Sequence, residues 1–284
     1  AAGIVADFNA GSVVWSGDTD QIANVENIVG TLGNDQITFA AGDNTFYDIG
    51  GADTVFGGDG FDVASYRYLA GGSSSVHVTV DMNAGTSLDS LGNTDFIAVE
   101  GVDGSQGDDS ITGNDADNAI NGWAGNDTLV GGANTGGPRV IDGLGDAVGD
   151  FLLFSSGVVA EEGNAGVFVD MASGTATDTF GGTDTFSGFE NLGGSHNNDQ
   201  LYGDDGDNII AGGAGDDYLD GRGGDDMASY AADIAGVTVN LTTGSATDGF
   251  GGTDTMVSIE RVLGSAFGDM LTGDGGDNLF IGGA

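Results

Sequence analysis

Acidic and amide side chains recur every nine residues in four stretches of this 284-residue chain. In the stretch from Gly194 to Ser229 they are Asp199, Asn208, Asp217 and Asp226. Each one follows a glycine-rich segment and stands two residues before an apolar residue. Hard divalent cations such as Ca²⁺ take roughly six to eight oxygen ligands from carboxylates and backbone carbonyls. This array therefore predicts that the chain binds several calcium ions.

We number each nine-residue unit so that the acidic or amide residue is position six and the apolar residue is position eight. Asp150 is assigned as a displaced position-six residue, because it follows an insertion at about 131–144 that carries the only proline, Pro138. The predicted metal ligands are the position-six residues Asp35, Asn44, Asp53, Asp62, Asp109, Asn118, Asp127, Asp150, Asp199, Asn208, Asp217, Asp226, Asp269 and Asn278.

The spacing also predicts how these residues are positioned. Positions seven to nine fit a short strand whose middle side chain points into the core, and two units would make one turn of a flattened solenoid. Glycine at positions one, two and four permits positive φ, which turns the loop carbonyls inward. A cation would then lie between loops of units i and i+2. The predicted pairs are Asp35 with Asp53, Asn44 with Asp62, Asp199 with Asp217, and Asn208 with Asp226.

The second unit of every block carries asparagine at position six: Asn44, Asn118, Asn208 and Asn278. Asparagine supplies an oxygen without a charge. One edge of each roll is therefore predicted to carry less negative charge and to bind calcium more weakly.

A second module recurs between the blocks, and residues 165 onward match residues 235 onward. Its period-two apolar alternation predicts short strands joined by glycine-rich turns. The predicted fold is all-β, with tandem calcium-bound parallel β-roll or β-solenoid blocks separated by short-strand spacer modules. Strand modules are expected at 1–29, 67–103, 155–193 and 231–263, and roll blocks at 30–66, 104–154, 194–230 and 264–284.

Further metal candidates lie in the spacers. Glu190 and Glu260 stand just before a block, as do Glu26 and Glu100, and each either completes the first calcium site or is a strand-edge carboxylate. Asp184 and Asp254 lie in Gly-Gly-Thr-Asp-Thr turns, where they either hold extra calcium or make an Asx-type turn. Tyr66, Phe154 and Tyr230 follow the last unit of a block and are interpreted as caps over an open end of the solenoid.

The composition limits the classes of partner that the chain is expected to bind. The chain has 45 acidic residues against four basic ones, a formal charge of −41. So large a negative charge opposes compaction without bound cations. It argues against nucleic acid as a partner, because binding to phosphates rests on lysine and arginine. No apolar run approaches the length that spans a bilayer, so membrane insertion is not expected.

No catalytic residue and no organic cofactor site is predicted. The only histidines, His77 and His196, lie outside any zinc motif, and the chain has neither a nucleophile elbow nor a phosphate loop. Paired carboxylates are abundant, but each has a better explanation as a metal ligand. The chain is therefore not expected to be an enzyme.

The glycine-rich units, of which Gly221 to Ser229 is one example, resemble the RTX calcium-binding repeats of secreted bacterial proteins. The resemblance implies a parallel β-roll with calcium between successive loops. It also implies an extracellular location, export by a type I system, and folding only where calcium is available.

Two functions fit this resemblance. One is an extracellular structural or adhesive repeat protein of surface-layer, filament or adhesin type, which calcium rigidifies and which associates with copies of itself. The other is the calcium-binding region of a larger secreted enzyme or toxin, which assists secretion and folding.

Overall fold

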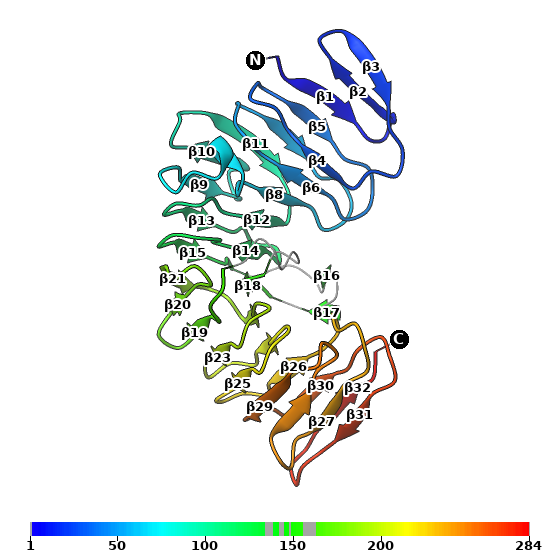
Figure 1. Cartoon of the computed structure of the whole chain (residues 1–284), viewed down its shortest axis with the longest axis vertical. Coiled ribbons are helices and arrows are strands. Elements are labelled where there is room, and N and C mark those ends of the chain that lie inside the picture. The colour runs from blue at the N-terminus through cyan, green and yellow to red at the C-terminus, as the bar shows by residue number, and fades with distance from the viewer. Residues whose placement is uncertain (1, 134–138, 142–144, 148, 156–162, 284) are drawn as a thin grey trace. The chain divides into compact units, whose positions relative to one another are not determined.

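The computed structural model describes residues 2–133, 139–141, 145–147, 149–155 and 163–283 (Figure 1). Much of the predicted insertion, residues 134–138 and 142–144, lies outside the described residues. The chain forms two compact units, residues 1–135 and 136–284. The described residues are almost entirely β-structure, with one 3-10 turn, η1 (Leu69–Gly71). No helix in this described part is long and apolar enough to cross a membrane.

In the first unit, each nonapeptide contributes one short strand to one of two parallel sheets. Ile37 lies opposite Val55 in sheet A, and Phe46 lies opposite Ala64 in sheet B, so each turn of the roll advances by two units. The sheet A repeat strands are β5 (Gln36–Thr38), β7 (Thr54–Phe56), β13 (Ser110–Thr112) and β15 (Thr128–Val130). The sheet B strands are β4 (Asn27–Val29), β6 (Thr45–Tyr47), β8 (Val63–Ser65), β12 (Gly101–Asp103) and β14 (Ala119–Asn121).

The second unit repeats this arrangement. Leu201 pairs with Leu219 in sheet A, and Leu192 pairs with Ile210 in sheet B. The sheet A repeat strands are β23 (Gln200–Tyr202), β25 (Tyr218–Asp220) and β31 (Met270–Thr272). Sheet B contains β18 (Phe151–Leu153), β22 (Asn191–Gly193), β24 (Ile209–Ala211), β26 (Met227–Ser229), β30 (Arg261–Leu263) and β32 (Leu279–Ile281). A separate hairpin joins β16 (Arg139–Ile141) to β17 (Gly145–Ala147).

Each spacer module forms a three-stranded antiparallel meander that is hydrogen-bonded into sheet A. In the second spacer, β11 (Thr94–Ala98) pairs in parallel with β7 and β9 (Val78–Asp81) pairs in parallel with β13, so the sheet runs through the module (Figure 1). In the fourth spacer, β29 (Thr253–Val257) pairs with β25 and β27 (Thr238–Asn240) pairs with β31 in the same way. The spacer strands are β1 (Ile4–Asp7), β2 (Ser12–Trp15), β3 (Asp18–Gln21), β9 (Val78–Asp81), β10 (Thr86–Asp89), β11 (Thr94–Ala98), β19 (Phe168–Asp170), β20 (Thr175–Thr177), β21 (Thr183–Ser187), β27 (Thr238–Asn240), β28 (Ser245–Thr247) and β29 (Thr253–Val257).

The core of each roll is a stack of position-eight side chains. Ile37, Ile111, Leu129, Leu201 and Leu219 have no exposed surface. Burial of about 1.5–3 kcal/mol for each such side chain provides the apolar part of the stability. The predicted all-β fold of parallel roll blocks is confirmed, and the spacers that join the blocks continue the sheets within each unit.

This continuity corrects the interpretation of the aromatic caps. Tyr66 is 1% exposed and Tyr230 is 3% exposed, so neither covers an open end. The Tyr66 hydroxyl donates to Ser87 Oγ at 2.8 Å, and the Tyr230 hydroxyl donates to Asp254 Oδ2 at 3.0 Å. Both tyrosines are interior side chains because a spacer continues the roll beyond them.

Candidate metal centre

The position-six side chains form columns along the two edges of the rolls. The backbone N–H of Asp199 donates to Asp217 Oδ1 at 2.9 Å, and that of Asn208 donates to Asp226 Oδ1 at 2.8 Å. The same bond joins Asp35 to Asp53, Asn44 to Asp62 and Asp109 to Asp127, always across 18 residues. Units i and i+2 are therefore neighbours along each edge, and a cation shared by each pair stays a prediction. The twelve position-six residues from Asp35 to Asp226 are buried, while Asp269 and Asn278 are half-buried.

Glycine is needed in these loops for two different reasons. At position four it supplies positive φ, as at Gly51 (127°) and Gly215 (126°), as predicted. At position one the reason is space: a Cβ on Gly212 would overlap Asp217 Oδ2, and a Cβ on Gly57 would overlap Asp62 Oδ2. Position-one glycine thus lets the second carboxylate oxygen fold back over its own loop.

Several of these carboxylates bury an oxygen that accepts no hydrogen bond. Among the described residues this holds for Oδ2 of Asp53, Asp62, Asp217, Asp226 and Asp269. Buried polar atoms are nearly always paired, so these oxygens are candidates for binding a cation. No cluster of three acidic or histidine side chains suited to a metal occurs in the described ranges, so loop carbonyls would have to supply the remaining ligands of a bound ion. Carboxylate and carbonyl oxygens in glycine-rich loops are ligands that suit Ca²⁺.

The opening unit of each block differs, because a hydroxyl residue stands at position two. Ser195 donates from Oγ to Asp199 Oδ1 at 2.9 Å and from its backbone N–H to Asp199 Oδ2 at 2.6 Å. We call this arrangement the hydroxyl clasp. Its counterparts are Thr31 on Asp35 and Ser105 on Asp109, whereas Ser265 makes only the Oγ bond to Asp269. Protein donors already satisfy both carboxylate oxygens of Asp35, Asp109 and Asp199. These three are therefore weaker candidates for metal ligands than Asp53, Asp62, Asp217 and Asp226.

The clasp gives a first prediction, tested by Ser195→Ala. The substitution removes the bond to Asp199 and the acceptor for the Asn197 N–H at 3.0 Å. We expect a loss of about 1–3 kcal/mol in the free energy of unfolding at saturating calcium, with the number of bound ions unchanged. Thermal unfolding and elemental analysis measure the two quantities. Exposed Ser187→Ala is the matched control, and a lost ion without lost stability would contradict the clasp.

The spacer glutamates extend the columns on the sheet B edge. Glu260 Oε2 accepts the N–H of Asp226 at 3.0 Å, and Glu190 Oε2 accepts the N–H of Asp150 at 2.9 Å. Glu100 Oε2 accepts the N–H of Asp62 in the same way, at 3.1 Å. Each glutamate thus occupies the place of a position-six residue in the next turn. Asp150 occupies the position equivalent to Asp62 and Asp226, as expected for a displaced position-six residue.

Spacer aspartates extend the columns on the sheet A edge. Asp254 Oδ1 accepts the Asp217 N–H at 3.2 Å, and Asp95 Oδ1 accepts the Asp53 N–H at 2.9 Å. Asp184, at the matching spacer position, is buried. The Asx-type turn is made instead by Asp178 and Asp248, whose Oδ1 atoms accept two or more turn N–H groups. Sequence reasoning missed Asp95, although its Thr-Asp pair aligns with those of Asp184 and Asp254.

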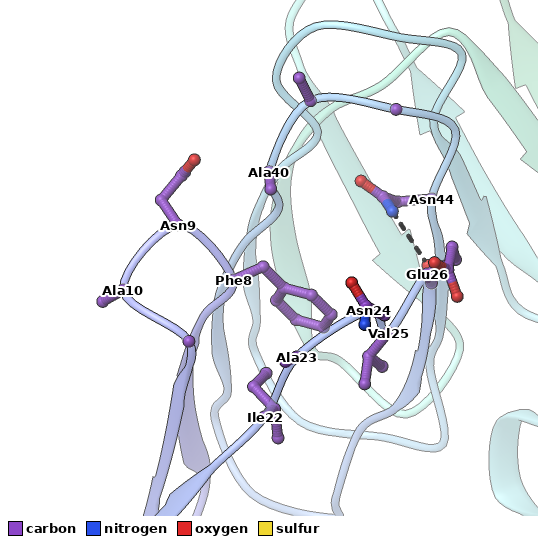
Figure 2. Close-up of a pocket in the computed structure, with 13 residues that line it drawn as sticks. Phe8, Asn9, Ala10, Ile22, Ala23, Asn24, Val25, Glu26, Ala40 and Asn44 are labelled. Atoms are coloured by element: carbon purple, nitrogen blue, oxygen red, sulfur yellow. Dashed lines mark hydrogen bonds between the residues drawn. The ribbon is translucent and has the colours of Figure 1, made fainter.

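The recurring asparagine has a structural reason. In the first three blocks its Nδ2 donates to the backbone carbonyl of the glutamate 18 residues earlier, as Asn208 does to Glu190 at 2.9 Å. Asn44 Nδ2 donates to the Glu26 carbonyl in the same way, at 3.3 Å (Figure 2). This bond lies beside a cavity of about 500 Å³ whose lining includes Phe8 and Val25. In the fourth block, Asn278 Nδ2 donates to Asp274 Oδ1 at 3.1 Å. An aspartate lacks this donor. Asparagine at this position therefore serves the junction of a block with its spacer. The edge that carries it is still acidic, because Asp226, Glu190 and Glu260 lie along the same edge.

The electrostatics of the columns favour a bound cation. Burial, together with the charges of Asp199 and Asp254, raises the pKa of Asp217 to about 8. Burial, together with neighbouring carboxylates, likewise raises the pKa of Asp53 to about 8 and that of Asp226 to about 7. A divalent cation in the column would offset both causes and keep these groups ionised.

These shifts predict how the metal-free protein responds to pH. Aspartate in an unfolded chain titrates near about pH 3.9, so the folded chain binds more protons above that pH. The stability from these groups is present at low pH and is lost as pH rises through about 8. Calcium-stripped protein should therefore gain β-structure by circular dichroism when pH is lowered from about 9 to about 5. A loss of β-structure over that range would contradict the raised pKa values.

Comparison with known families agrees with this geometry. The RTX calcium-binding nonapeptide repeat matches the chain in four copies, at residues 29–64, 103–135, 194–228 and 259–284. No curated protein gives a significant match to the chain. The chain therefore carries four copies of the RTX calcium-binding nonapeptide repeat. Calcium is the cation that such repeats bind, and the resemblance noted from the sequence is confirmed.

Proposed function

We propose that the chain is an extracellular calcium-binding repeat protein with a structural or adhesive role, of surface-layer, filament or adhesin type. One observation carries the proposal: the spacers are hydrogen-bonded into sheet A, so each unit forms one uninterrupted ladder. A load along such a unit is shared by successive strand pairs. The role needs no catalytic residue, and we propose that the chain is not an enzyme.

The proposed location rests on the calcium that folding is expected to need. Extracellular calcium modules bind with dissociation constants of about 10⁻⁴–10⁻³ M, far above cytosolic calcium. A chain with a formal charge of −41 would stay expanded inside the cell and fold after export. We propose a type I export route on this ground, together with the RTX repeats. Heterologous contacts between copies would extend the structure into a filament.

Force spectroscopy on single molecules tests the structural role. The chain, tethered by its two ends, should resist extension in millimolar calcium and release length in discrete steps. After chelation it should stretch smoothly as an unfolded chain. Smooth, resistance-free extension in saturating calcium would overturn a load-bearing role. Electron microscopy of the same calcium-loaded sample tests self-association. A sample that contains only monomers would contradict the proposed filament.

A further inference from the structure

The first unit buries a guanidinium group between aromatic rings on the outer side of sheet B. Arg67 is 4% exposed, and its Cζ lies 4.8 Å from the ring centre of Tyr47 and 5.0 Å from that of Tyr68. Trp123 adds a third ring at 5.3 Å. A guanidinium between aromatic faces is held by cation–π attraction and stacking.

The second unit has small residues at the corresponding positions. Tyr66 and Tyr230 follow equivalent strands, which aligns Tyr47 with Ala211 and the pair Arg67-Tyr68 with Ala231-Ala232. A cavity of about 390 Å³ lies there, and Ala211 and Ala232 are part of its lining. This volume lies within the usual range of small-ligand pockets, about 300–1,000 Å³.

The walls of this cavity suit a flat organic cation. The His196 and Phe250 rings line it, with their centres 6.4 Å apart and nearly perpendicular. Asp233 contributes a carboxylate that is 7% exposed and is held by the Gly249 N–H at 2.6 Å. Ser229 Oγ is buried at the wall and has no hydrogen-bond partner among the described residues. The cavity thus offers aromatic rings, an unpaired hydroxyl and a carboxyl group. Burial, together with the charges of Asp248 and Asp254, raises the pKa of Asp233 to about 7, and a bound cation would keep it ionised.

We propose that the cavity at Ala211 and Ala232 binds a guanidinium group from outside the chain, in the place that Arg67 fills in the first unit. Asp233 would pair with the cation, Phe250 and His196 would contact its faces, and Ser229 would take one of its N–H groups. The ligand is a free guanidinium compound or an arginine side chain of another polypeptide. This inference goes beyond the proposed function and rests on the comparison of the two units.

The test uses the whole calcium-loaded chain, with ethylguanidinium and N-acetyl-arginine amide as probes. Both should shift the backbone amide resonances of Ala232 and Phe250 in a ¹H–¹⁵N titration. N-acetyl-lysine amide should bind more weakly, because an ammonium group lacks the planar face. Tighter binding of the arginine amide would identify a polypeptide arginine as the ligand, and equal binding would identify a free guanidinium compound.

Two variants make the site falsifiable. Ala211→Tyr, Ala231→Arg and Ala232→Tyr together supply the guanidinium and the rings of the first unit, and should abolish the shifts. Asp233→Asn keeps the side-chain shape and should weaken binding about tenfold by removing the charged partner. The proposal is overturned when neither probe shifts these resonances in the native chain. It is equally overturned when both variants bind as tightly as the native chain does.

Discussion

Removing calcium is expected to unfold both units. The chain then carries its formal charge of −41 with buried carboxylates that have lost their counterions. Metal-binding energy becomes folding energy when the unfolded chain has no preformed site. The β-signal in circular dichroism should collapse on chelation, and the radius of gyration should rise toward about 60 Å, the value for an unfolded chain of this length. Calcium should restore both.

Magnesium at the same concentration is the control. It demands near-octahedral geometry and gives up water reluctantly, so it should restore little structure. Small-angle scattering gives the radius, and elemental analysis gives the ion content. Two results together would show that the columns of position-six residues are not calcium sites. The β-structure would persist after chelation, and elemental analysis would find no calcium in the protein before chelation.

Asp217→Ala is expected to be the most damaging single substitution in the second unit. It removes a carboxylate whose Oδ2 needs a cation, and it leaves the Asp199 N–H without its acceptor. Breaking a buried charged pair costs about 3–5 kcal/mol. At saturating calcium we expect a loss of that size and at least one calcium ion fewer per chain. Urea unfolding and elemental analysis measure these quantities.

Calcium dependence separates a metal ligand from a merely structural residue. Without calcium the Asp217 carboxylate repels Asp199 and Asp254, so its removal should cost far less and should favour the folded state above about pH 8. Exposed Asp205→Ala is the matched control and should stay within about 0.5 kcal/mol in both conditions. An equal loss with and without calcium would make Asp217 structural.

The nine-residue register was enough to predict the roll itself. Position-eight residues such as Ile37 and Leu201 had to be buried, because one side chain per short strand points inward. The same register predicted that Asp199 pairs with Asp217, since two units make a turn. These features are local, so the sequence spacing carries them directly.

Features that depend on the spacers were not predictable in the same way. Asp95 joins Asp53 only because β11 pairs with β7, across 42 residues that include a meander. Long-range pairing of this kind leaves no periodic signal. The hydroxyl clasp does have a signal in the sequence, because each opening unit carries Ser or Thr at position two. Its meaning emerges only once Ser195 is placed on Asp199.

The bond from asparagine to glutamate also determines where the chain tolerates a change of length. Successive blocks start 74, 90 and 70 residues apart, yet each glutamate-to-asparagine step spans 18 residues. Every glutamate thus resets the phase of the nine-residue repeat. Segments of different length can be spliced in upstream of it without disturbing the next block. One residue inserted between Glu190 and Asn208 would instead put every later loop of that block out of step.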